Sequence, residues 1–183
     1  MREKVFLGLA AAGFLLAAAF AIAYIHQISA PVRPTRSLIL PPEKVTFAFG
    51  AEDGGPVLSP DGTRLVFPGR DASGKETLWV RPLDSLSAQR LEGTGDASYP
   101  FWSLDSRTIG FFAGGKLKRI EATGGAAQTI CDAPRGRGGA WNERDVIVLA
   151  ADRVGGLSRV PAAGGVPVQV THLGQSQVYN SHR

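Results

Sequence analysis

Hydrophobic and polar residues alternate in a pattern that returns several times along this chain. The clearest copy runs from Leu58 to Phe67, where an apolar residue leads into Ser-Pro-Asp-Gly and an alternating apolar segment leads out. Proline presets φ for the second position of a turn, aspartate bonds backbone amides ahead of it, and glycine accepts a positive φ. Alternation on both sides of such a turn indicates extended strands, so this stretch predicts a β-hairpin.

The same pattern occurs twice more. Residues 102–111 restate it 44 positions later, and residues 141–149 form a shorter copy that lacks the Asp-Gly pair. Each copy precedes a second hairpin in which two apolar positions stand 13 residues apart. These pairs are Leu78 and Leu91, Leu117 and Ile130, and Leu157 and Val170. A repeat of 39–44 residues that contains four short antiparallel strands is typical of a β-propeller blade.

The predicted fold class is therefore all-β, with about three four-stranded antiparallel blades in an incomplete ring. We place the blades at residues 51–94, 95–134 and 135–173, with the start of a fourth at 174–183. Propellers close with roughly 4–8 blades, so we expect a fragment of a longer protein, with a ring built from several chains as the alternative. Residues 38–47 are expected to be the strand that closes the last blade of the full ring.

The N-terminus has a different pattern, because residues 5–25 carry no charge and consist largely of Leu, Ala, Phe and Ile. As a helix this run would be about 31 Å long, which matches the hydrocarbon core of a bilayer. Arg2 and Lys4 precede it, which favours a cytoplasmic N-terminus. We expect residues 1–4 in the cytoplasm and a single transmembrane helix or signal anchor over 5–28 in the cytoplasmic membrane.

The segment after this run is expected to lie outside the cytoplasm. Residues 29–37 contain prolines and arginines and are predicted to be an extended linker, followed by a periplasmic or extracellular propeller over 38–183. Small residues around Ala23 and Ala30 keep a cleaved signal peptide open as the alternative, in which case the protein would be secreted.

Charge and composition exclude several kinds of site. The net charge is +4, but the first 36 residues contribute +3 of it, so the predicted propeller has no basic surplus for nucleic acid. Cys131 is the only cysteine, and we expect it to be a small buried residue. The three histidines, at positions 26, 172 and 182, share no metal-ligand spacing. We predict no metal site, no cofactor and no nucleic-acid partner.

The repeated polar residues are predicted to be structural turn residues. They are Ser59, Pro60, Asp61, Gly62, Ser103, Asp105 and Asn142. The run Pro-Arg-Gly-Arg-Gly-Gly at 134–139 is predicted to be a loop between blades, in which Arg135 and Arg137 would face an anionic ligand. The chain has no Gly-x-Ser-x-Gly nucleophile elbow and no protein-kinase motif, so we predict no catalytic residue and no enzymatic activity.

The Ser-Pro-Asp-Gly turn, the apolar strand after it and Leu-Trp-Val-Arg at 78–81 resemble the blades of TolB-like and WD40-like propellers. Asp-Ser-Leu at 84–86 and Tyr-Pro-Phe-Trp-Ser at 99–103 more narrowly resemble propellers that follow the membrane helix of bacterial receptor serine/threonine kinases. The resemblance implies a non-catalytic, membrane-anchored module that presents blade loops to a protein, peptide or carbohydrate. The alternative is the ectodomain of such a kinase, or the propeller domain of a peptidase, whose catalytic domain lies outside this chain.

Overall fold

The computed structural model describes residues 13, 16–24, 38–50, 53–152 and 155–172 of the chain. Its contacts divide the chain into two units, Met1–Ile39 and Leu40–Arg183. In the first unit, residues 16–24 are helical and their side chains are exposed. Among the described residues, none of the helices has the length and apolar character needed to cross a membrane. Most of the predicted membrane segment 5–28, the linker 29–37 and the predicted fourth blade 174–183 lie outside the described residues.

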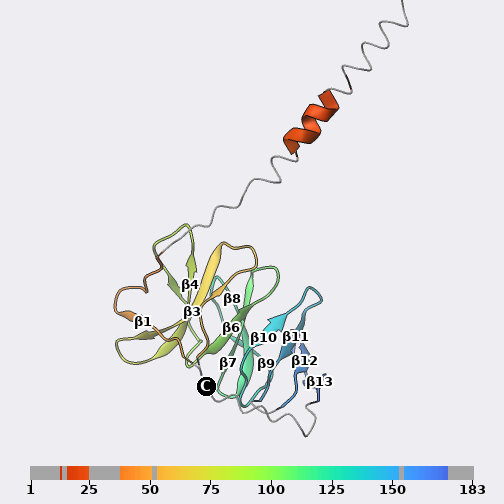
Figure 1. The fold of residues 1–183 in the computed structure, drawn as a ribbon. Helices are drawn as coiled ribbons and strands as arrows, with labels where there is room; N and C mark the ends of the chain where they lie inside the picture. The colour runs from red at the N-terminus through yellow and green to blue at the C-terminus, as the bar shows by residue number, and fades with distance from the viewer. Residues whose placement is uncertain (1–12, 14–15, 25–37, 51–52, 153–154, 173–183) are drawn as a thin grey trace, which may run out of the picture. The chain divides into compact units, whose positions relative to one another are not determined.

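The second unit consists of three antiparallel sheets that follow one another in chain order (Figure 1). The first sheet contains β1 (Val45–Phe47), β2 (Val57–Leu58), β3 (Arg64–Asp71), β4 (Glu76–Pro82) and β5 (Gln89–Arg90). The second contains β6 (Ser98–Trp102), β7 (Thr108–Ala113), β8 (Lys116–Glu121) and β9 (Gln128–Asp132). The third contains β10 (Gly139–Trp141), β11 (Val146–Leu149), β12 (Ser158–Pro161) and β13 (Val168–Gln169). The predicted four-stranded antiparallel blades are confirmed.

Each blade packs through its sheet faces against the next one. One apolar cluster joins the first two sheets, with Val66 and Leu78 on one side and Ile109 and Phe111 on the other. A second cluster joins the second and third sheets through Phe112 and its neighbours. The middle sheet is therefore buried on both faces, and so β7 is apolar at successive positions and does not alternate strictly.

The innermost strand of the first blade comes in two pieces. β1 pairs with the C-terminal half of β3, with Val45 opposite Asp71, and β2 pairs with its N-terminal half, with Val57 opposite Val66. β1 is thus part of the first blade and not, as the sequence predicted for residues 38–47, a strand of the last blade. Its alternating apolar residues predict a strand, but such a pattern does not specify the pairing partner.

Candidate functional site

The Ser-Pro-Asp-Gly turn of the first blade is closed by its own side chains. Ser59 donates its hydroxyl to Asp61 Oδ1 at 2.6 Å and accepts the Arg64 N–H at 2.9 Å. Asp61 also accepts the backbone N–H and the hydroxyl of Thr63. These hydrogen bonds, chiefly the one from Ser59, lower the pKa of the Asp61 carboxyl to about 2. Pro60 and Gly62 are exposed at the tip of the turn.

The other two blades reproduce this hydrogen-bond scheme. Ser103 donates to Asp105 Oδ1 at 2.6 Å and accepts the Thr108 N–H at 2.9 Å, as Ser59 does in the first blade. In the third blade, the side chain of Asn142 replaces both the serine and the aspartate. Its Oδ1 accepts two backbone N–H groups, including that of Val146 at 3.0 Å. The oxygens of the repeated polar side chains thus hold the turns closed.

The same turns join the first blade to the second. Each turn has one residue with positive φ at an equivalent position, namely Gly62 at 71°, Ser106 at 61° and Asp145 at 54°. Ser106 accepts the Asp61 N–H at its hydroxyl, and its carbonyl accepts Arg64 Nη2 at 2.6 Å. Between the first two blades, polar groups at this end therefore connect one turn to the next.

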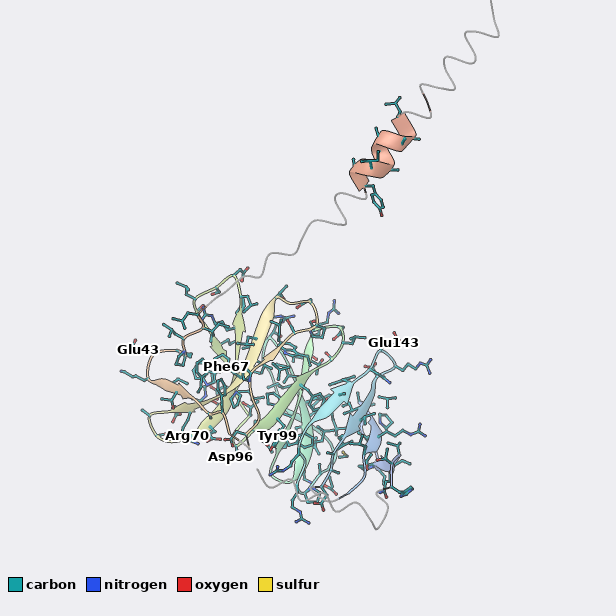
Figure 2. All side chains as sticks on the ribbon, viewed as in Figure 1. Glu43, Phe67, Arg70, Asp96, Tyr99 and Glu143 are labelled. Atoms are coloured by element: carbon teal, nitrogen blue, oxygen red, sulfur yellow. The ribbon has the colours of Figure 1, made fainter. Side chains whose placement is uncertain are left out.

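The opposite end of the second and third blades contains a hollow of about 300 Å³. Three connections surround it: the one from β5 to β6, the tight turn from β7 to β8, and the loop from β9 to β10. Its polar and glycine residues include Asp96, Tyr99, Gly114, Gly115, Arg135 and Arg137. We call this hollow the Tyr99 pocket. Figure 2 shows Asp96 and Tyr99 close together, with Glu143 in a separate part of the domain.

Two glycines of the β9–β10 loop and Gly139 at the start of β10 are required by packing or by backbone conformation. A methyl group at Gly136 would overlap the ring of Phe112, and one at Gly139 would lie 2.7 Å from the ring of Phe101. Gly138 has a φ of 123°, which L residues with a side chain rarely adopt. The alternation of arginine and glycine in this run therefore follows from a loop that lies flat on two aromatic rings.

Both arginines of this loop line the Tyr99 pocket. The sequence predicted that they belong to a loop that faces a ligand. Arg135 Nη2 donates to Asp152 Oδ2 at 3.1 Å, while 62% of its side chain remains exposed. The Arg137 guanidinium stands 6.0 Å from the centre of the Tyr99 ring, within the range of a cation–π contact.

Tyr99 is the pocket residue that sequence reasoning missed. Its φ is +49°, and the pairing of β6 with β7 shifts register between Ser98 and Phe101, which marks a β-bulge. The Tyr99 N–H donates to the Asp53 carbonyl at 2.8 Å instead of joining the regular ladder. A positive φ is costly for a bulky residue, about 1–3 kcal/mol, and such strain is concentrated at functional sites. The local sequence does not signal this conformation, because a residue that precedes a proline favours the extended region at negative φ.

The arrangement of the three sheets decides the fold. Each is an antiparallel unit four strands wide, in which the first strand of the first unit comes in two pieces, and successive units pack face to face. These are blades of a β-propeller. No protein-family model matches the sequence, and a search of the curated proteins finds no match.

Solved propeller structures resemble the chain. TolB from Acinetobacter baumannii aligns at a TM-score of 0.50 and 20% identity, over 61% of this chain and 31% of that one. The propeller domain of the Trilobed protease from Pyrococcus furiosus aligns at 0.52 and 14% identity, over 72% and 44%. A TolB from Agrobacterium tumefaciens aligns at 0.48 and 19% identity, over 62% and 48%. The chain thus spans less than half of each structure, and at these identities the likeness concerns the propeller fold alone.

Proposed function

We propose that this chain is a non-catalytic binding module, whose propeller presents the Tyr99 pocket to a protein, peptide or carbohydrate. The observation that carries the proposal is the conformation of Tyr99, a bulky residue that a β-bulge holds at positive φ in the wall of a hollow. Bulges often redirect side chains next to binding and active sites. A regular strand, with Tyr99 at negative φ, would avoid this strain. A binding role accounts for the strained conformation.

The two ends of the blades differ in how they use their polar groups. At the end of the repeated turns, the side-chain oxygens of Ser59, Asp61, Ser103 and Asp105 bond their own backbone or one another. At the pocket end, the Arg135 side chain remains 62% exposed while it pairs with Asp152, its ion-pair partner among the described residues. This contrast supports binding at the pocket end.

We further propose that the N-terminal segment anchors the module in the cytoplasmic membrane, with the propeller outside the cytoplasm. The uncharged run over residues 5–25 and the basic residues before it support this orientation. Extraction of membranes with alkaline carbonate tests the anchor, because an integral protein stays in the pellet and a peripheral or secreted one is released. Recovery of the full chain in the soluble fraction would refute the anchor and leave the pocket proposal standing.

Site-specific photocrosslinking tests the binding role. A benzophenone amino acid replaces Asp96 at the rim of the pocket and, as the matched control, Glu143 on the distant β10–β11 turn; both positions are exposed. In cells that express the full chain, irradiation should produce a discrete adduct from position 96 and none from position 143. Equal adducts from both positions, or none from position 96, would contradict the proposal.

A further inference from the structure

We infer that the Tyr99 pocket takes a carboxylate group, supplied by a Glu or Asp side chain of an acidic peptide. This inference rests on the proposed function and narrows its ligand class. The hydrogen-bond donors, the glycines and the aromatic ring of the pocket each contribute one step of the argument.

Arg135 supplies the charge for a carboxylate ligand. A guanidinium has five N–H donors in a planar fork that matches a carboxylate, and the ion pair with Asp152 uses only one of its nitrogens, Nη2. Exposed ion pairs of this kind contribute little net stability, so a ligand carboxylate can join or replace Asp152 at small cost. Because 62% of the Arg135 side chain is exposed, the remaining donors are accessible from solvent.

The β7–β8 turn adds backbone donors beside this arginine. Gly114 and Gly115 have φ of 59° and 71°, and neither of their N–H groups donates to a backbone carbonyl among the described residues. No atom lies within 4 Å of the place a Gly114 side chain would occupy, so a ligand can approach the backbone closely. The Ala133 N–H donates to the Gly115 carbonyl at 2.9 Å and thereby ties the turn to the loop of Arg135. Successive N–H groups of this kind form anion-binding concavities.

The aromatic ring and the size of the hollow favour a peptide side chain over a sugar. Arg137 already lies over the Tyr99 ring, so that face is not open for a sugar to stack on it. A volume of about 300 Å³ is at the lower limit of small-ligand pockets and suits one side chain of a larger ligand. Asp96 at the rim carries the opposite charge to Arg135 and weakens the attraction for anions.

The test is the affinity of the full chain, in detergent micelles at low salt, for fluorescein-labelled hexaglutamate, measured by fluorescence anisotropy with hexaglutamine as the neutral probe. Two pairs of variants change equal charge at the pocket and at the distant β10–β11 turn. Arg135→Gln should weaken hexaglutamate binding about tenfold, as expected when a charge-assisted hydrogen bond is lost, and Arg144→Gln should change it less than about twofold. Asp96→Asn should tighten binding severalfold, whereas Glu143→Gln should leave it unchanged.

Three outcomes would overturn the inference. One is that hexaglutamate fails to bind, or that hexaglutamine binds equally well. Another is that the variants at the pocket and at the β10–β11 turn change affinity to the same extent, which indicates attraction to overall charge. The third is that oligogalacturonate binds through Arg135 while hexaglutamate does not, which assigns the pocket to an acidic sugar. In each case a specific adduct from position 96 would still uphold the binding function, whereas its absence would refute that function itself.

Discussion

The packing of Phe101 allows a quantitative test of how the second and third blades are joined. Its ring lies over its cross-strand partner Gly110, where a methyl group would overlap the ring, and also against Gly139 of the third blade. Gly110 is not at positive φ, so Gly110→Ala introduces no left-handed backbone strain and acts chiefly on the available space. The perturbation therefore isolates a single steric contact inside the second blade, with the ring that packs against the third blade.

The expected cost follows from how tightly the ring is held. Phe101 is 7% exposed and belongs to the cluster between the blades, so it cannot swing away from a new methyl group. Overpacking of this kind costs about 1–3 kcal/mol in the free energy of unfolding. Phe101→Leu alone should cost about 1–2 kcal/mol through the space it leaves. In the double variant, the alanine methyl occupies part of that space. The stability loss of the double variant should therefore be smaller than the sum of the two single losses by at least about 1 kcal/mol.

The assay is urea unfolding of the full chain in detergent, followed by the fluorescence of the three tryptophans, all of which lie in the blades. Gly55→Ala is the control, because nothing lies within 4 Å of the added methyl and its φ is not positive; it should change stability by less than about 0.5 kcal/mol. If the losses from Gly110→Ala and Phe101→Leu add within about 0.5 kcal/mol, the two residues do not compete for space and the reasoning is refuted.

Three further predictions concern single positions. Gly62→Ala should cost about 1–2 kcal/mol in urea unfolding, because φ is 71° and the added methyl meets no atom within 4 Å; an unchanged midpoint would argue against backbone strain. Asp61 has its folded pKa lowered to about 2, so its stabilising contribution is complete above the unfolded pKa of about 4 and is lost as pH falls from about 4 to 2; Asp61→Asn should flatten that part of the acid-unfolding curve. Burial raises the pKa of the Cys131 thiol, so a thiol reagent should label the native protein at least about a hundredfold more slowly than the urea-unfolded one, and equal rates would contradict its burial.

The sequence predicts the blades well because their turns are local. Ser59 and Asp61 bond groups within five residues, so the turn chemistry can be read from a short window and recognised again at Ser103 and Asp105. The burial of Cys131 could also be predicted, because it is a small apolar residue in a predicted strand.

The features that shape the pocket depend on contacts between distant residues. Tyr99 reaches positive φ because its N–H bonds the carbonyl of Asp53, which belongs to a connection of the first blade. Gly136 is required because it lies on Phe112, 24 residues earlier in the chain. No local pattern encodes either contact. The sequence could therefore predict that Arg135 and Arg137 lie in a loop, but not that they line one pocket together with Tyr99.

A departure from the repeat can itself carry structural information, as the outward face of the first blade shows. Arg81 pairs with Leu65 across β3 and β4, in the position that Ile120 and Val160 occupy in the later blades. Ile120 and Val160 are buried in the clusters that join each blade to the one before it. An arginine at this position therefore indicates that the first blade has a different neighbour on that face.

Among the described residues, the contacts of Arg81 and Phe67 identify this neighbour. Arg81 is only 8% exposed, and its guanidinium donates to the carbonyls of Leu40 and Ser85. Phe67, which corresponds to the buried Phe111 of the second blade, is fully buried beneath Phe47, whose ring meets it edge to face at 5.1 Å. Residues 40–47, which include β1 of the same blade, thus cover the surface that another blade covers elsewhere. A charged residue with two backbone acceptors suits such a cover, because an irregular segment offers free carbonyls that a paired sheet does not.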